Sequence, residues 1–312
     1  MNVVLLFPGQ GSQKPGMARD LVDALPAARE TFTTVDAALG ESLSTLCFDG
    51  PGETLTLTHN AQPALLAHGA AVWASVRERV GPHVRAAAGH SLGEFTAYHA
   101  AGAFDVAHGA RLVRRRGELM FESGERRPGT MAAILGDVAG GIEALCAKAS
   151  ADGGCVVPAN YNTTGQVVIS GEVPAVERAM ELAKAAGAKR AIRLTVSGAF
   201  HSPLMAVARQ GLAYALEQAQ LRDPAFPVYA NVNAEPVRSA ADARRLLLEQ
   251  LTAPVKWTQV VERLASDYPD ALYVEMGPGN VLTGLVKKIA PSVETTTCGT
   301  VTEVEQLLSR VA

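Results

Sequence analysis

The sequence predicts an α/β protein with a largely parallel sheet and a second, smaller unit inserted into it. Short apolar runs alternate along the chain with stretches of helical periodicity, which is typical of a parallel sheet covered by helices. Residues 3–7 are apolar without alternation, as expected for a strand that is buried on both faces. Residues 131–196 follow a different order, in which two predicted strands succeed one another with only a turn between them.

Three further strands are predicted for the larger unit. Residues 84–88 are a weaker candidate that a helical pattern follows directly, and residues 228–232 and 272–276 are the later candidates. The last of these ends at a Gly-Pro-Gly turn at residues 277–279. The longest uncharged stretch, residues 59–76, contains several polar residues, whereas a membrane span needs about 20 predominantly apolar ones. We therefore expect a buried helix there and no contact with a membrane.

The middle of the chain predicts a β-α-β-β-α-β unit, the ferredoxin-like order. Its elements are a strand at 131–135, a helix at 141–150, strands at 155–158 and 167–170 on either side of a turn at 162–165, a helix at 173–186 and a strand at 191–196. Plausible linkers lie at residues 124–129 and 197–198. We therefore expect a ferredoxin-like subdomain of residues 127–197, inserted into a large α/β domain of residues 1–126 and 198–312. A ligand cleft is expected between them, because such clefts are preferred binding sites.

Charge and cysteine content exclude several classes of protein. The 312 residues carry 28 basic and 31 acidic side chains, a net charge of −3 at pH 7, which is unlike the basic footprint of a nucleic-acid-binding protein. The four cysteines are scattered, without a CxxC pair or a histidine at ligand spacing, so we expect reduced thiols and no metal site. The first residues lack the basic and long apolar regions of a signal peptide, so we expect a cytoplasmic protein.

Ser91 is the candidate nucleophile. It is the central residue of a G-x-S-x-G pattern at residues 89–93, between the predicted strand 84–88 and a helical pattern. This is the context of a nucleophile elbow, in which a strained turn projects the serine and glycines let strand and helix approach closely. The main-chain N–H of Leu92 would then point at a developing oxyanion at the helix N-terminus.

A nucleophilic serine needs a base, and His201 is the best candidate among seven histidines. It follows the last strand of the middle unit and precedes Ser202 and Pro203, which suit a helix cap and first turn. His90 adjoins the nucleophile but is expected to point away from it. Structural or solvent roles are expected for the remaining histidines, which are His59, His68, His83, His99 and His108. No aspartate or glutamate stands out as a third catalytic member.

Two other segments carry candidate binding groups. Gln10 lies between two glycines directly after the first strand, where loops at strand C-termini form the ligand crevice, and its main-chain N–H could be a second oxyanion donor. Four arginines lie on a predicted helix at 111, 114, 115 and 116. Such a run is usually a solvated face, but one buried arginine could bind a substrate carboxylate in bidentate fashion.

Together these segments resemble malonyl-CoA:acyl carrier protein transacylases, the malonyl-loading enzymes of bacterial fatty-acid synthesis, which are similar also to acyltransferase domains of polyketide synthases. The resemblance covers essentially the whole chain, and the motifs come in the same order. They are residues 7–13, 89–94, 116–117, 198–202 and 277–279. The resemblance implies an α/β-hydrolase-like core with a ferredoxin-like insertion. It also implies an acidic acyl carrier protein as partner.

The resemblance further implies a role for individual residues. Ser91 would carry the malonyl group as an ester, with His201 as base and then acid, and the N–H groups of Gln10 and Leu92 would form the oxyanion hole. Arg116 would pair with the malonyl carboxylate. The main-chain carbonyl of Gln250 would orient the histidine in place of a carboxylate, and Phe200 would crowd an α-methyl branch. Residues expected to face the cleft from the inserted subdomain are Asn160, Asn162 and Gln166.

This interpretation requires malonyl-CoA as substrate but no bound cofactor and no metal, and we expect a monomer. If His201 kept the ordinary histidine pKa, loading would fall as the pH drops through about 6.5. Three alternatives stay open. They are a free-standing acyltransferase that loads a polyketide synthase carrier, a serine thioesterase or esterase, and a non-catalytic carrier-binding module. Arg116 argues against the plain esterase, which needs no carboxylate-binding residue.

Overall fold

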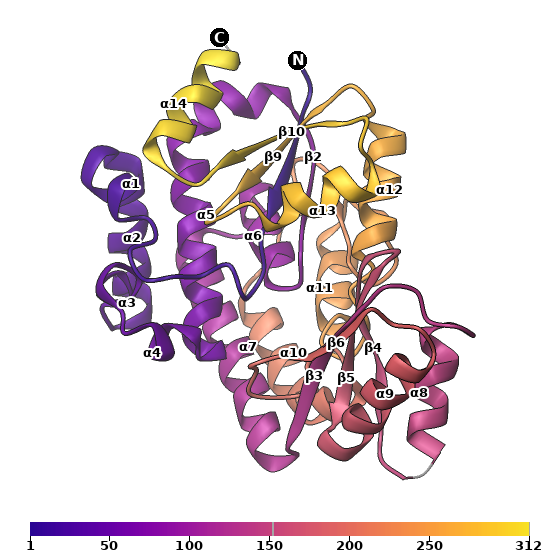
Figure 1. Cartoon of the computed structure of the whole chain (residues 1–312). Helices are drawn as coiled ribbons and strands as arrows, with labels where there is room; N and C mark the ends of the chain where they lie inside the picture. The colour runs from indigo at the N-terminus through magenta and orange to yellow at the C-terminus, as the bar shows by residue number, and fades with distance from the viewer. Residues whose placement is uncertain (152, 312) are drawn as a thin grey trace.

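Two sheets organise the chain in the computed structural model, which describes residues 1–151 and 153–311 (Figure 1). The larger sheet is parallel except at one edge, where the last strand runs antiparallel to its neighbour. Its strands are, in order, β10 (Glu294–Cys298), β9 (Leu272–Met276), β1 (Val3–Phe7), β2 (Val84–Gly89), β7 (Val228–Tyr229) and β8 (Pro236–Val237).

Helices cover both faces of the larger sheet. The alternate residues of β1 divide between two core clusters, with Val3, Leu5 and Phe7 in one and Val4 and Leu6 in the other. The second cluster is formed with α12 (Trp257–Asp267) and α13 (Val281–Ile289). The first is formed with α1 (Arg19–Ala24), α2 (Pro26–Leu39), α3 (Leu43–Asp49), α4 (Gly52–Thr56), α5 (Thr58–Val80), α6 (Leu92–Ala100), α7 (Val106–Arg126), α10 (Arg209–Gln218), α11 (Ala240–Glu249) and α14 (Val301–Arg310). Uninterrupted burial along β1 follows from this arrangement.

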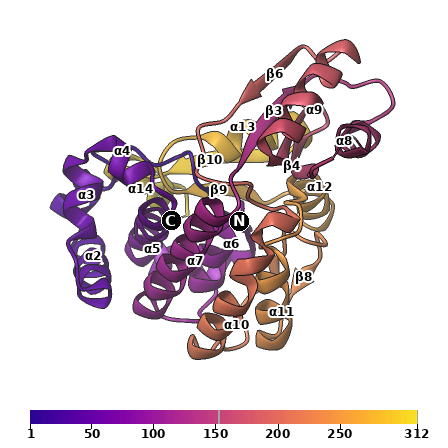
Figure 2. The same ribbon diagram turned by 90° about the horizontal axis from the view of Figure 1, so that it is seen from below.

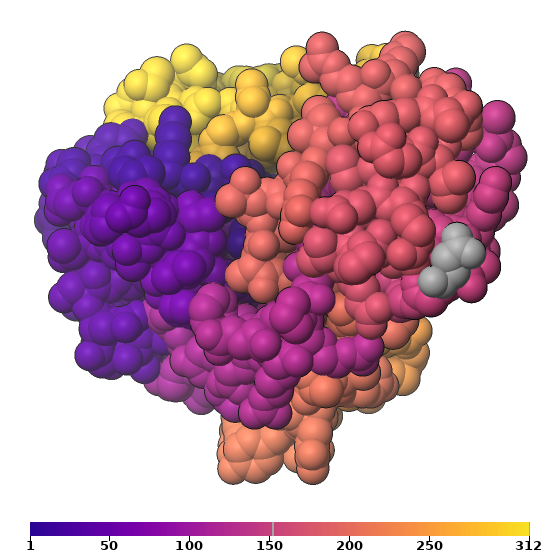
Figure 3. Space-filling model, turned by 60° about the horizontal axis from the view of Figure 1, so that its bottom comes forward, coloured from indigo at the N-terminus to yellow at the C-terminus, as the bar shows by residue number. Residues whose placement is uncertain are grey.

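The smaller sheet is antiparallel, and α8 (Ile142–Ala151) and α9 (Val173–Ala185) lie together on one of its faces (Figures 1 and 2). Its strands are, in order, β4 (Val156–Thr163), β5 (Gln166–Glu172), β3 (Gly129–Leu135) and β6 (Arg190–Arg193). Ala132 and Ile134 of β3 pack against α8 and α9 on the outer side. Met131 and Ala133 point to the opposite side, toward the larger unit. Figure 3 shows a furrow between the N-terminal segment, in indigo, and this second unit.

Most predicted elements are present with shifted ends. The strands expected at 3–7 and 272–276 are confirmed, and the one at 84–88 continues to Gly89. The turn expected at 162–165 was placed too early, because β4 pairs with β5 as far as Thr163. The strand at 228–232 is shorter than expected, and β8 and β10 were not predicted at all. Within the described residues, no helix is both long enough and apolar enough to cross a bilayer.

Candidate active site

Ser91 lies in a strained turn between β2 and α6. Its backbone has φ 50° and ψ −104°, a combination that a serine adopts only when the surrounding structure imposes it. The two flanking glycines explain how the turn closes. A Cβ atom on Gly89 would lie 1.9 Å from the carbonyl carbon of Gly93, and one on Gly93 would lie 1.9 Å from the carbonyl oxygen of Phe7. The turn therefore requires glycine at both positions, and the nucleophile-elbow geometry predicted from the sequence is present.

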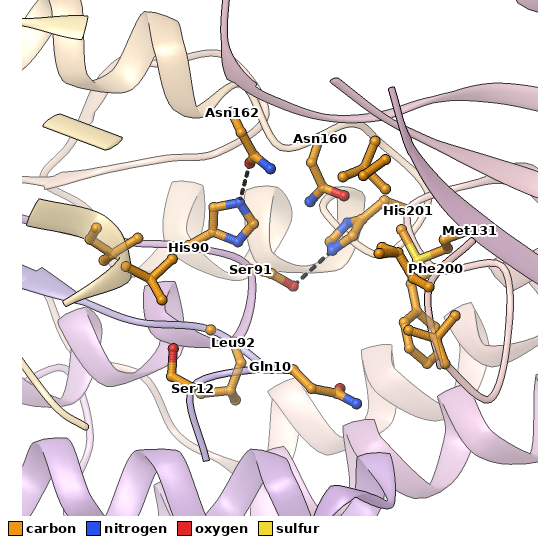
Figure 4. A pocket seen from close by; sticks show the side chains of 18 of the residues that line it. Gln10, Ser12, His90, Ser91, Leu92, Met131, Asn160, Asn162, Phe200 and His201 are labelled. Carbon is orange, nitrogen blue, oxygen red and sulfur yellow. Dashed lines mark hydrogen bonds between the residues drawn. The ribbon is translucent and has the colours of Figure 1, made fainter. Parts of the chain in front are cut away.

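Ser91 and His201 are hydrogen-bonded to each other, as Figure 4 shows. The distance from Ser91 Oγ to His201 Nε2 is 2.7 Å. The other ring nitrogen, Nδ1, lies 2.9 Å from the carbonyl oxygen of Gln250 and 3.2 Å from that of Ala253. Carbonyl oxygens only accept hydrogen bonds, so Nδ1 carries the proton and Nε2 is left as an acceptor for the serine hydroxyl. The pair has the arrangement of nucleophile, base and orienting group that acyl transfer requires.

Burial keeps His201 neutral. The side chain is 3% exposed, and this burial, followed by the positive charge of Arg116, lowers the pKa of His201 to about 3. The helix η2 (Pro203–Ala208) begins two residues after it, and the hydroxyl of the intervening Ser202 caps that helix by accepting from Leu204 N at 3.2 Å. The cap holds the chain on one side of His201, and the two carbonyl oxygens hold its ring.

Arg116 is buried beside the nucleophile, whereas the other three arginines of its cluster are exposed or half-buried. Its Nη1 donates to Gln62 Oε1 at 2.7 Å, and its Nη2 donates to Gln250 Oε1 at 2.8 Å and to Ser91 Oγ at 3.3 Å. The guanidinium carbon lies 5.1 Å from the ring centre of Phe95. Nε is buried and has no partner in the described part of the chain. A positive charge therefore lies next to the hydroxyl that would carry the acyl group.

Gln10 and Leu92 are the two residues whose main-chain amides the sequence predicts as oxyanion donors. Both residues line the cavity that contains Ser91, Gln10 from the loop after β1 and Leu92 from the first turn of α6 (Figure 4). Within residues 1–151 and 153–311 neither N–H donates a hydrogen bond to the protein. The Gln10 side chain turns aside to donate to Thr58 Oγ1 at 3.3 Å. Two unused amides beside a nucleophile can bind an oxyanion.

A cavity of about 390 Å³ connects these groups and lies between the two units. Met131, Ala133 and Val168 of the smaller sheet form an apolar wall. The cavity is lined by all the residues proposed from the sequence except one; they are Gln10, Ser91, Leu92, Arg116, Asn160, Asn162, Gln166, Phe200 and His201. The exception is Gln250, which is buried and contacts Arg116 and His201. In the described part of the chain, no group of three or more His, Cys, Asp or Glu side chains is placed to hold a metal ion.

His90 differs from its sequence-based expectation. It lines the cavity, and its Nε2 lies 2.9 Å from Asn162 Oδ1 of the second unit (Figure 4). The expectation assumed that neighbouring side chains alternate as on a strand, but the left-handed φ at Ser91 breaks that alternation. His90 thus forms a hydrogen bond between the two units at the cavity.

Two buried residues of the site were missed. Asn231 accepts a hydrogen bond from Ser91 N at 2.7 Å and donates one to Gly89 O at 2.8 Å, so it holds the elbow from behind. Glu94 accepts hydrogen bonds from Gln250 and from Asn231 N. The only sequence signal for Glu94 was its place directly after the G-x-S-x-G pattern. Asn231 gave no signal, because it lies within the strand predicted at 228–232.

Comparisons with known proteins identify the family to which the chain belongs. A model of the acyl transferase domain family matches residues 4–305. The chain is 45% identical over 287 residues to a malonyl CoA-acyl carrier protein transacylase of Bacillus subtilis (strain 168), covering 92% of this chain and 90% of the relative. It is 44% identical over 284 residues to the protein of that name from Escherichia coli (strain K12), covering 91% of each.

Solved structures show the same similarity over the whole chain. An acyl-carrier-protein-S-malonyltransferase from Bartonella henselae superimposes with a TM-score of 0.94 at 41% identity, covering 100% of this chain and 99% of that one. A malonyl-transacylase solved in complex with its type II PKS acyl-carrier protein superimposes with a TM-score of 0.94 at 40% identity, covering 99% and 100%.

Proposed function

This chain belongs to the malonyl CoA-acyl carrier protein transacylase family, and on that basis we propose that it transfers a malonyl group from malonyl-CoA to the phosphopantetheine thiol of an acyl carrier protein. The observation that carries the proposal is the buried guanidinium of Arg116, 3.3 Å from the hydroxyl of a serine that is already hydrogen-bonded to a neutral histidine. A serine-histidine pair alone serves any acyl group, whereas a buried cation beside it favours an acyl group that ends in a carboxylate.

In the first half-reaction, Ser91 Oγ attacks the thioester carbonyl while His201 Nε2 takes the hydroxyl proton. The negative charge that develops on the carbonyl oxygen is stabilised by the N–H groups of Gln10 and Leu92. The carbonyl oxygens of Gln250 and Ala253, bound to Nδ1, stabilise the imidazolium that forms. The C–S bond then breaks, and the proton passes from His201 to the sulfur of coenzyme A.

The second half-reaction reverses these steps with a different thiol. His201 takes the proton of the phosphopantetheine thiol, and the sulfur attacks the ester carbonyl on Ser91. The C–O bond breaks, and the proton returns to Ser91 Oγ. Thioester, ester and thioester are similar in energy, so positioning and oxyanion stabilisation supply the catalysis, and Arg116 holds the carboxylate throughout.

Other residues of the cavity are proposed to position the substrate. Phe200, on the wall next to His201, would leave little space for an α-methyl branch. Asn160, Asn162 and Gln166 present polar groups from β4 and β5 and would contact the thioester arm.

The domain organisation is part of the same proposal. We assign residues 127–197 to an inserted subdomain, because all four strands of the smaller sheet fall within it and their order is that of a ferredoxin-like fold. Residues 1–126 and 198–312 form the large domain, which is proposed to be α/β-hydrolase-like because the elbow follows a central parallel strand. We further propose a monomer. We also propose a cytoplasmic location, which the four unpaired cysteines support.

A second candidate function is the loading of a polyketide synthase carrier domain by the same chemistry. The observation that favours it is the similarity to a malonyl-transacylase whose solved partner is a type II PKS acyl-carrier protein. A serine thioesterase is disfavoured by the buried Arg116.

One experiment separates these functions. The enzyme is incubated with malonyl-CoA and with fatty-acid and polyketide carrier proteins in parallel, and the intact masses of enzyme and carriers are measured. Malonyl transfer to the fatty-acid carrier supports the first function, and transfer only to the polyketide carrier supports the second. Hydrolysis of malonyl-CoA without transfer to either carrier contradicts both.

The rate of Ser91 acylation at saturating malonyl-CoA is expected to be constant between pH 8 and pH 5. His201 must be neutral to accept a proton, and with a pKa of about 3 it loses that form only in more acidic solution. A histidine with an ordinary pKa would make the acylation rate fall near pH 6.5. For His201 we expect that fall only in more acidic solution. Rapid-quench intact mass spectrometry gives the rate, with circular dichroism at each pH as the control for folding. A midpoint near 6.5 in a folded protein would contradict the lowered pKa of His201.

Docking of an acidic carrier is expected to depend on a local basic patch, because the net charge of −3 offers no overall attraction. The exposed candidates are Lys189 and Arg190 before and on β6, and Lys287 and Lys288 on α13. Reversing these charges is expected to raise the KM for carrier and to leave self-acylation by malonyl-CoA unchanged. Equal loss of both half-reactions would show that the patch does not serve carrier docking.

The matched control for this patch is Arg79→Glu. Arg79 is exposed and lies at the end of α5 opposite to Thr58, the residue that contacts Gln10. A helix rises about 1.5 Å per residue, so the two ends are roughly 30 Å apart. The control is expected to change the net charge without changing the KM for carrier.

A further inference from the structure

Glu94 is a fully buried carboxylate directly behind the catalytic residues. It lies in the first turn of α6, and its side chain is 0% exposed. Its Oε2 accepts hydrogen bonds from Gln250 Nε2 at 2.7 Å and from Asn231 N at 3.0 Å. Its Oε1 is buried and has no partner in the described part of the chain. Glu94 takes no part in the proton transfers described above, although burying a carboxylate with an unpartnered oxygen costs folding free energy.

The Gln250 side chain connects Glu94 to Arg116. Its Nε2 donates to Glu94 Oε2, and its Oε1 accepts from Arg116 Nη2 at 2.8 Å. A carboxylate only accepts hydrogen bonds and a guanidinium only donates them, so this amide has a single favourable orientation. The main-chain oxygen of the same residue accepts from His201 Nδ1. Glu94 therefore acts on the site through Gln250. The side chain of Gln250 accepts from Arg116, and its main-chain oxygen orients the ring of His201.

Without substrate, the positive charge of Arg116 is balanced by Glu94 across the Gln250 side chain. The hydrogen-bond acceptors of Arg116 are two amide oxygens and a hydroxyl, which carry no formal charge. Glu94 is the acidic group whose field acts on it. Burial raises the pKa of Glu94 to about 7, while its hydrogen bonds and the charge of Arg116 oppose the rise. The site thus holds one cation and one anion, separated by a neutral amide.

Arrival of the substrate carboxylate at Arg116 disturbs this balance, because two anions then share one cation. We propose that Glu94 is a positioning residue for malonyl recognition, which holds the Gln250 amide toward Arg116 and takes up a proton when a substrate carboxylate binds the guanidinium. This inference rests on the proposed malonyl transfer. Like charges near one another favour protonation of one of them, and a carboxyl with an unpartnered buried oxygen is the member that protonates most readily.

The proposal sets a sign for the pH dependence of selectivity. The substrate carboxylate binds better when Glu94 is protonated, so the ratio of kcat/KM for malonyl-CoA to that for acetyl-CoA falls as the pH rises through 7. For an upward shift of one pKa unit on binding, the ratio falls roughly fivefold between pH 6 and pH 8. Both substrates carry the same coenzyme A phosphates, so titration of those phosphates cancels in the ratio.

Other groups around Glu94 do not titrate in this interval. Tyr98, one turn along α6, has a pKa raised well above 10 by burial and by the charge of Glu94, and therefore stays neutral. Arg116 on α7 keeps its charge, since burial lowers its pKa only to about 10. His201, which faces Arg116, is neutral throughout, with a pKa of about 3. A change of selectivity between pH 6 and pH 8 therefore reports on Glu94.

Two variants separate the charge of Glu94 from its hydrogen bonds. Glu94→Gln keeps the volume and an oxygen for Asn231 N and Gln250 Nε2 but cannot ionise, so we expect a ratio that no longer varies with pH. Glu94→Leu removes the acceptor as well and frees the Gln250 amide. At pH 6, where Glu94 of the wild type is already mostly protonated, we expect the ratio to fall by about tenfold, the value of a hydrogen bond to a charged group. Equal pH slopes in wild type and Glu94→Gln would overturn the proposal, as would a ratio at pH 6 that is the same in wild type and in folded Glu94→Leu.

A measurement on the unmodified protein covers the case in which the variants do not fold. Acylation of Ser91 exchanges a hydroxyl proton for a thiol proton and has no net proton change of its own. Near pH 7, an indicator dye is expected to report proton uptake on acylation by malonyl-CoA and none on acylation by acetyl-CoA. Malonylation without uptake would overturn the role of Glu94 and leave the proposed function intact. Absence of any malonyl adduct on the wild-type enzyme would instead contradict the proposed function itself.

Discussion

Replacing Arg116 with alanine is expected to remove most malonyl transfer and to reduce acetyl transfer far less. In the variant a malonyl carboxylate would enter a buried site without its guanidinium partner. A charge-assisted hydrogen bond of this kind contributes about 1.5–3 kcal/mol, which corresponds to a discrimination of roughly ten- to 150-fold between malonyl and neutral acyl groups. Acetyl transfer keeps the nucleophile, the base and the oxyanion amides, so it should retain most of its rate.

The measurement is kcat/KM for malonyl-CoA and acetyl-CoA with wild type, Arg116→Ala and Arg116→Lys. Lysine should rescue malonyl transfer only in part, because it supplies the charge without the planar pair of donors. Arg115→Ala is the matched control. Arg115 adjoins Arg116 on α7 but points outward, where it donates to Glu118 Oε2 at 2.9 Å. If the ratio of the two substrates is the same in Arg116→Ala and wild type, Arg116 does not bind the carboxylate.

Ser91→Ala is expected to abolish the acyl-enzyme, the largest single effect predicted for this chain. The reaction passes through an ester on Ser91 Oγ, and the variant has no atom in that position. The hydrogen bond from Ser91 N to Asn231 uses only the main chain, so the elbow is expected to keep its shape. Intact mass after incubation with malonyl-CoA should show no added malonyl group, while circular dichroism remains that of the wild type.

Ser12→Ala is the control for this prediction, because Ser12 lines the same cavity. It should accumulate the malonyl adduct as the wild type does. If Ser91→Ala formed the malonyl adduct and Ser12→Ala did not, the nucleophile would be Ser12, in the loop after β1.

The sequence predicts most reliably those features that are local in the chain. β1 and β9 are recognised because each is a run of residues buried on both faces, and the elbow because it requires glycines at fixed spacing around Ser91. β10 was missed because its sequence, Glu-Thr-Thr-Thr-Cys, has no apolar run, although it pairs along the whole of β9. An edge strand of this kind depends on its neighbour in the sheet, which local composition does not reveal.

The site shows the same division between local and long-range features. Ser91 and His201 follow from their immediate sequence, but the contacts of Gln250 with His201 and Glu94 join residues far apart in the chain. Gln250 was proposed only through the family resemblance, and Glu94 and Asn231 were not proposed at all. His90 was assigned the wrong direction because the left-handed backbone at Ser91 cannot be inferred from alternation. Polar networks that close over long separations need the tertiary structure.

The position of β1 in the larger sheet bears on how the chain is synthesised and folded. β1 pairs on one side with β2, at Val84, and on the other with β9, at Leu272. During translation, β1 therefore cannot pair with β9 until nearly the whole chain has been synthesised. The sheet of β3 to β6 closes within residues 129–193 and can pair long before that. Pairings between distant segments form slowly and leave apolar strand edges open to aggregation. We therefore expect nascent chains stalled before β9 to require chaperones, with the smaller sheet already protected from proteolysis.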